Sequence, residues 1–227
     1  MTMKPFVQKL MKQPGALAEN EVKELLRSYG IPTTTFAVIR SEKDLEALSL
    51  RFPVALKVCS RKILHKTDVG GVKLGIRDLP ALKTALKDFQ KRFPGEAFLV
   101  DEMVNPGVEI IVGLVQDPSF GMCIMCGIGG IFTELYKDVS FRVVPIERVD
   151  AEEMVEEIRG KKLLEGFRHI RADKEKVLDL LMTISELGEE LGDRVDQLDL
   201  NPVLVYADSL CVVDAKMIVK QPGGSCT

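Results

Sequence analysis

The segment SRKILHKTDVGGVK, residues 60–73, gathers the side chains best suited to phosphate chemistry in this sequence. It lies between two apolar, strand-like runs and contains His65, Lys66 and the pair Gly70-Gly71. Glycines let backbone N–H groups come close to an anion, and lysines neutralise phosphate charge. The segment therefore indicates a loop that binds phosphate groups.

Lys57 stands in the apolar run just before this loop, between Leu56 and Val58. A lysine in an apolar strand usually needs an anionic partner, which a bound phosphate would supply. The alternative is an ordinary tight hairpin with an edge-strand lysine whose ammonium group reaches water. Local sequence alone favours that alternative, because glycine pairs are common in turns.

His65 is one of two histidines, and a lone histidine is more often structural than catalytic. Its polar loop, the adjacent Lys66 and the nearby glycine pair favour a catalytic role. A neutral ring nitrogen can attack phosphorus, whereas an imidazolium cannot. The other histidine, His169, is assigned no role.

Three oxygen-bearing side chains form a second candidate site. Asp199 and Asn201 are two residues apart and so share one face of an expected strand, and Asp214 in the next strand could face them. Such oxygens suit a Mg²⁺ ion shared with nucleotide phosphates. The alternative is the polar outer face of an antiparallel pair, although the strongly apolar neighbours of Asp214 argue against it.

Other candidate motifs carry weaker signals. Glu109 lies in a strongly apolar run, where a carboxylate needs a hydroxyl group or a cation. The glycine-rich block at 127–146, which includes Glu134, lacks the spacing of a dinucleotide fingerprint. The pair Cys123 and Cys126 has CxxC spacing but lies in an expected strand, so a redox function is disfavoured.

Alternating strand and helix patterns must position these residues. The turn Asn105-Pro106-Gly107 marks a boundary between two lobes. We expect an N-terminal helical segment at 1–34, a small lobe at 35–106, a large lobe at 107–220 and a loose tail at 221–227. The expected helices are 16–29, 41–48, 78–93, 152–159 and 174–191; the expected strands are 36–39, 54–59, 72–76, 97–104, 108–115, 122–126, 141–146, 198–206 and 210–215.

Composition narrows the class of protein. The 227 residues include 31 Lys and Arg against 34 Asp and Glu, so a net charge of −3 disfavours a strongly basic nucleic-acid binder. The absence of Trp and only 6% aromatic residues also argue against a base-stacking platform. Five scattered cysteines indicate free thiols in a reducing compartment, and no signal peptide or membrane span is evident. We therefore expect a soluble cytoplasmic protein.

Four segments in this order resemble the ATP-grasp β subunit of ADP-forming acetyl-CoA (acyl-CoA) synthetase. They are PVALKVCSRKILHKTDVGGVKLGI, LVDEMVNPGVEIIVGLVQDPSFG, GIGGIFTELYKDVSFRVVPI and LDLNPVLV. The resemblance runs from about Leu17 to Val219. It implies an α+β (α/β) ATP-grasp fold, whose two lobes enclose a nucleotide cleft. It also implies the reaction acyl-CoA + ADP + phosphate = carboxylic acid + CoA + ATP.

In that family a separate or fused α portion binds CoA and carries the first phosphohistidine. The resemblance implies that His65 receives the phosphoryl group and passes it to ADP, in an α2β2 assembly. It further assigns the remaining site residues by motif: phosphate binding to Lys57, Lys66, Gly70 and Gly71; adenine and ribose binding to Glu102, Val104 and Glu109; Mg²⁺ binding to Asn201 and Asp214; and a supporting role to Asp199.

Two other functions stay open at this point. One is another ATP-grasp ligase that joins a carboxylate to an amine or thiol through an acyl phosphate. The other is a non-catalytic module that senses nucleotide and regulates a partner. His65 distinguishes the acyl-CoA synthetase from such a ligase, because a direct ligase needs no phosphorylated enzyme. A sensor could lose His65 or the metal ligands, and this chain has both.

Overall fold

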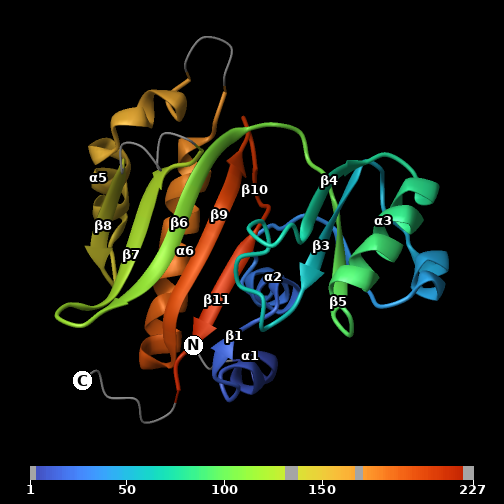
Figure 1. The fold of residues 1–227 in the computed structure, drawn as a ribbon. Helices are drawn as coiled ribbons and strands as arrows, with labels where there is room; N and C mark the ends of the chain where they lie inside the picture. The colour runs from blue at the N-terminus through green and yellow to red at the C-terminus, as the bar shows by residue number, and fades with distance from the viewer. Residues whose placement is uncertain (1–3, 131–137, 167–170, 222–227) are drawn as a thin grey trace.

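The computed structural model describes residues 4–130, 138–166 and 171–221. Two antiparallel sheets lie side by side, and an N-terminal helical segment lies next to both (Figure 1). Within the described ranges, no helix combines the length and apolar character that crossing a membrane requires. Glu134, His169 and the expected tail beyond residue 221 lie outside the described residues.

The smaller sheet has four strands in the order β2-β5-β3-β4, formed by Phe36–Ile39, Ala97–Glu102, Val54–Cys59 and Val72–Ile76. A 3-10 helix, Glu42–Ala47, follows β2, and α3, Leu79–Arg92, packs on β3 and β4. Asp78 caps α3 by accepting the Ala81 N–H at 2.8 Å. The strand β3 is central, so the alternative that Lys57 lies on an edge strand is wrong.

The larger sheet runs β1-β11-β9-β6-β7-β8, with β10 paired to β9. Its helices are α5 and α6, and two short 3-10 helices connect them to their neighbours. The bounds are β6 Val108–Asp117, β7 Gly121–Ile128, β8 Val139–Val143, α5 Arg148–Glu157, η2 Arg159–Leu163, α6 Lys174–Leu191, η3 Gly192–Arg194, β9 Val195–Val205, β10 Leu210–Val212 and β11 Ala215–Val219.

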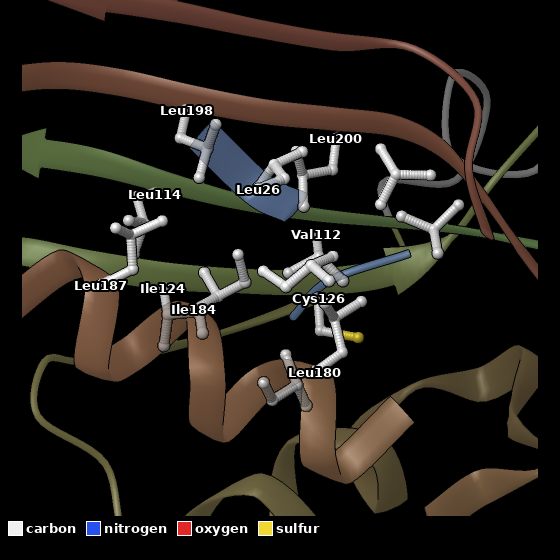
Figure 2. Close-up of a cluster of buried hydrophobic side chains, with 14 of the residues drawn as sticks. Leu26, Val112, Leu114, Ile124, Cys126, Leu180, Ile184, Leu187, Leu198 and Leu200 are labelled. Atoms are coloured by element: carbon white, nitrogen blue, oxygen red, sulfur yellow. The ribbon is translucent and has the colours of Figure 1, made fainter. Parts of the chain in front are cut away.

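One face of the larger sheet packs on α6. Val177, Leu180, Leu181, Ile184 and Leu187 recur at helical spacing and are buried. Figure 2 shows α6 side chains meeting residues from β6, β7 and β9 in a single apolar cluster. Burial of this stripe fixes the sheet against α6, so the edges of its strands can hold polar groups in defined positions.

The N-terminal segment comprises α1, Pro5–Leu10, β1, Gly15–Ala16, and α2, Glu19–Ser28. The expected apolar face of α2 is buried in the core of the larger sheet, where Leu26 joins the cluster of Figure 2. The short strand β1 pairs with β11. The sequence analysis missed α1 and β1, because each is too short to show a periodic pattern.

One expected strand differs from the structure in a way that affects the site. The run Leu210–Ala215 is interrupted: β10 ends at Val212 and β11 begins at Ala215. Asp214 therefore lies at the break between two strands. The Asn201 N–H donates to the Asp214 carbonyl oxygen at 3.2 Å, which holds this break against β9.

Candidate functional site

A cavity of about 470 Å³ opens between the smaller sheet, the larger sheet and the start of α2. Its lining combines residues from segments that are far apart in the sequence. The loop after β3 supplies His65 and Lys66, and β9 with the break before β11 supplies Asp199, Asn201 and Asp214; α2 adds Glu19. The structure thus brings together five of the residues that the sequence analysis singled out.

The loop that carries His65 is fixed by its own backbone and by α3. The Gly71 N–H donates to the Lys66 carbonyl oxygen at 2.6 Å, and the Arg92 guanidinium donates to the Val69 and Gly70 carbonyls at 3.0 Å each. Gly70 has a φ of +63°, in the left-handed region that favours glycine. Both glycines shape the loop, but neither lines the cavity.

Lys57 lies just behind the cavity wall and is 5% exposed. Its ammonium group lies 2.7 Å from Glu19 Oε1 and 3.0 Å from Asp101 Oδ2, and it donates to the Val213 carbonyl at 3.1 Å. The anionic partner that an apolar strand lysine requires is therefore supplied by the protein itself. The idea that this ammonium reaches water is wrong.

Lys66 joins the same network from the loop. Its ammonium group contacts Glu19 Oε2 and lies 2.9 Å from Asp214 Oδ1. The Asp214 Oδ1 atom also accepts the Ala215 N–H at 2.9 Å. One carboxylate, that of Glu19, therefore links Lys57, which lies behind the cavity wall, to Lys66, which lines the cavity.

Behind Glu19 lies Lys23, one turn further along α2 and completely buried. Its ammonium group lies 3.0 Å from Glu19 Oε1 and 2.6 Å from Asp101 Oδ2, and it donates to Thr34 Oγ1 at 2.8 Å. The Thr34 hydroxyl donates to Asp101 Oδ1. These groups satisfy one another's hydrogen-bonding capacity, which a buried charge requires.

Electrostatic effects in this network follow from burial and charge pairing. Burial alone would raise the pKa of Glu19, but the ammonium groups of Lys57, Lys23 and Lys66 outweigh it and hold that pKa below its usual range. For Asp214, burial and the nearby Glu19 raise the pKa despite Lys57 and Lys66. A partly buried carboxylate with a raised pKa is a natural position for a divalent cation.

The cavity also fits a divalent cation shared with phosphate. Asp199, Asn201 and Asp214 offer hard oxygen atoms on one wall, and burial raises the pKa of Asp199. Within the described ranges, no group of three or more His, Cys, Asp or Glu side chains could hold a metal alone. Mg²⁺ accepts such incomplete sites, because water and phosphate oxygens complete its octahedron.

The other nucleotide-binding candidates do not line this cavity. Glu102 ends β5, and its carboxylate accepts the Arg51 N–H at 2.8 Å. Val104 follows β5 in the connection to β6, and Glu109 is an exposed residue of β6 near Gly130. Their assigned roles in adenine and ribose binding therefore stay predictions.

Sequence reasoning missed Glu19, Lys23 and Asp101. The only local signal was the i,i+4 spacing of Glu19 and Lys23, which is also common on solvent-exposed helix faces. The four cysteines within the described residues are free thiols, as expected. Burial raises the pKa of Cys126 to about 12, so its thiol stays protonated and unreactive.

Comparison with known proteins identifies the family to which the chain belongs. The chain belongs to the ATP-grasp domain family, whose model matches residues 8–219. It is 38% identical over 224 residues to acetate–CoA ligase (ADP-forming) I subunit beta of Pyrococcus furiosus, a match that covers 94% of this chain and 96% of the relative. It is 40% identical over 205 residues to acetate–CoA ligase (ADP-forming) II of Archaeoglobus fulgidus, covering 89% of this chain but 30% of that relative.

Solved structures agree with this assignment. Acetyl-coenzyme A synthetase 1 of Ca. Korarchaeum cryptofilum, in complex with coenzyme A and Ca-AMPCP, superimposes with a TM-score of 0.86 at 38% identity, covering 94% of this chain and 97% of that one. A second structure of that protein holds coenzyme A and Mg-AMPPCP, with a phosphohistidine segment that points towards the nucleotide-binding site; its TM-score is 0.78 at 40% identity, covering 90% and 93%. The expected ATP-grasp fold is confirmed.

Proposed function

We propose that this chain is the nucleotide-binding β subunit of an ADP-forming acyl-CoA synthetase. The observation that carries the proposal is that His65, Lys66, Asp199, Asn201 and Asp214 all line the same cavity. A direct carboxylate ligase would not need a histidine at this place. A nucleotide sensor would not need the histidine and the metal-binding oxygens together.

In the proposed reaction, a ring nitrogen of His65 attacks the phosphorus of the phosphohistidine on the partner subunit, and the N–P bond there breaks as the bond to His65 forms. An oxygen of the ADP β-phosphate then attacks the phosphorus, the N–P bond breaks and ATP forms. Lys57 and Lys66 neutralise the phosphate charge, and the backbone of the loop at Gly70 and Gly71 covers it. Phosphoryl transfer depends mainly on such alignment and charge neutralisation.

The metal-binding part of the proposal rests on Asn201 and Asp214, with Asp199 in support. When bound, Mg²⁺ would offset the charge that develops between the β- and γ-phosphates. In the nucleotide-free protein the Asp214 carboxylate pairs with the ammonium group of Lys66, since Asp214 Oδ1 and Lys66 Nζ lie 2.9 Å apart. Glu102, Val104 and Glu109 complete the proposed site at the adenine and ribose end of the nucleotide.

The complete reaction requires a second component. We assign CoA binding and the first phosphohistidine to an α subunit, in an α2β2 assembly located in the cytoplasm. The subunit name of the Pyrococcus relative supports a partner chain, and the much longer Archaeoglobus relative leaves room for the second component within one chain. The division of this chain at residues 34, 106 and 220 belongs to the same proposal.

Labelled ATP tests the histidine directly. Given γ-labelled ATP and Mg²⁺, the wild-type chain should acquire phosphate that is stable in base and labile in acid, because a phosphoramidate has that stability. The His65→Asn variant should fold normally, lose the label and lose ATP formation in the assembled enzyme. The matched control is His169→Asn, which should keep both. Full activity of His65→Asn would eliminate the relay.

A further inference from the structure

Every N–H donor of the Lys57 ammonium group already faces an acceptor from the protein. An ammonium group has three N–H donors, and three acceptors surround that of Lys57: Glu19 Oε1, Asp101 Oδ2 and the Val213 carbonyl oxygen. A phosphate oxygen can bind Lys57 only if it replaces one of them. The protein therefore already occupies the positions that a phosphate would take.

Glu19 is the acceptor that both lysines share. Its Oε1 atom faces Lys57 and its Oε2 atom faces Lys66, while the residue itself lines the cavity. Two oxygens of one anionic group that bind two lysines reproduce what a phosphate group would do in the same place. Asp101 does not line the cavity, so it is less accessible to exchange.

The network is also neutral without a nucleotide. Three ammonium groups, those of Lys23, Lys57 and Lys66, face the carboxylates of Glu19, Asp101 and Asp214. An incoming polyphosphate adds negative charge beside Glu19, and the two anions compete for the same lysines. Repulsion between like charges a few ångströms apart is large in a partly buried site.

We infer that Glu19 is a built-in counter-ion that polyphosphate must displace from Lys57 and Lys66, and that it thereby lowers nucleotide affinity. Lys23 gives Glu19 a remaining partner after the exchange, because it contacts the same carboxylate from the buried side. When the nucleotide dissociates, Glu19 pairs again with Lys57 and Lys66. Helix α2 is then a part of the nucleotide site that promotes product release.

This inference deepens the proposed function and rests on it, because it takes nucleotide polyphosphate as the competing anion. It predicts that a substitution in the site increases the affinity for nucleotide. Glu19→Gln keeps the size of the side chain but removes its charge, so ATP should bind about tenfold more tightly. A residue with a purely structural role would give weaker or unchanged binding when substituted.

The test measures the affinities of ATP, ADP and adenosine for the full chain by isothermal titration calorimetry with Mg²⁺ present. In Glu19→Gln, the gain should be largest for ATP, smaller for ADP and absent for adenosine, which has no phosphate. The matched control is Glu21→Gln on the same helix. Glu21 pairs with Arg61 and does not line the cavity, so the ratio of ATP to adenosine affinity should stay at the wild-type value.

Two further variants keep the test decisive. Glu19→Asp retains the charge but withdraws it by one methylene group, so it should give an intermediate gain; if Glu19→Gln does not fold, the Asp variant carries the test in the same direction. Lys57→Met should weaken ATP binding but not adenosine binding. If Lys57→Met binds ATP like the wild type, the proposed phosphate site fails; if only the Glu19 variants show no gain, the counter-ion role alone fails.

Discussion

At the scale of single residues, Asp214 combines two demands that conflict. Burial and the neighbouring Glu19 raise the pKa of its carboxyl group, so the ionised form is held in the nucleotide-free protein at a cost. The same ionised carboxylate is what a Mg²⁺ site needs. Functional sites commonly keep such an unfavourable group for the sake of activity.

Asp214→Asn should therefore stabilise the nucleotide-free protein and damage its activity. Removing this partly buried charge should raise the melting temperature by about 2 °C, whereas phosphoryl transfer should fall by about 100-fold or more because the metal loses a charged ligand. Thermal melts and Mg²⁺ titrations of the transfer rate check both parts. Asp208→Asn, an exposed loop substitution, is the control. Unchanged Mg²⁺ dependence in Asp214→Asn would return Asp214 to a structural role.

At the scale of elements, α2 connects the stability of the fold to pH. In the folded protein, Lys57, Lys23 and Lys66 overcome the effect of burial and keep the pKa of Glu19 below the value of about 4.3 expected in the unfolded chain. The unfolded state therefore binds the proton more tightly. The resulting stabilisation is fully present above about pH 4.3 and is lost progressively as the pH falls from there towards the lower pKa of the folded state.

Urea unfolding between pH 7 and pH 3 should display this link. The unfolding free energy of the wild type should fall more steeply with decreasing pH than that of Glu19→Gln, which has no proton to bind at this position. Glu24→Gln, an exposed substitution on the same helix, should follow the wild-type curve. Parallel curves for the wild type and Glu19→Gln would show that α2 does not couple stability to pH.

Much of α2 could be predicted from sequence, and the reason is local. Val22, Leu25 and Leu26 recur at helical spacing, and Gly30 ends the pattern. The partner of Lys23 could not be predicted, since Asp101 lies 78 residues away on β5. Periodicity identifies which face of a helix is buried, but it does not identify which distant strand supplies the charge that a buried lysine requires.

The candidate site divides in the same way. Motif spacing placed Asp199 and Asn201 on one face, and the structure confirms that both line the cavity with Asp214. The position of Asp214 between two strands depends on hydrogen bonds to β9, which local sequence does not encode. Likewise, the loop glycines suggested phosphate binding, which stays a prediction; the contact that holds this loop to Arg92 from α3, through the Gly70 carbonyl oxygen, could not be read from local sequence.

At the scale of the whole molecule, the exposed position of His65 indicates where a partner subunit should bind. A phosphoryl group that forms on another subunit must reach this loop, so the partner should dock beside it. The isolated chain should exchange phosphate with nucleotide but should not turn over acyl-CoA. Addition of the CoA-binding subunit should restore turnover and give equal numbers of both chains in light scattering.

An Arg61→Glu substitution at the base of the same loop separates docking from nucleotide binding, because Arg61 pairs with Glu21 and does not line the cavity. It should disturb docking, and hence turnover, more than nucleotide binding. Acyl-CoA turnover by the isolated wild-type chain would show that no second subunit is required.

The pairing of β1 with β11 has a mechanical consequence. Gly15 lies opposite Val219 and Ala16 opposite Ile218, so the two chain ends leave this antiparallel ribbon on the same side. A pulling force between the chain ends acts along the hydrogen bonds between the two strands, so it breaks the hydrogen-bonded pairs one after another and not all at once. Glu19 follows only three residues after Ala16. Tension between the chain ends would thus reach Glu19 and its lysines well before it loaded the long contact between β6 and β9.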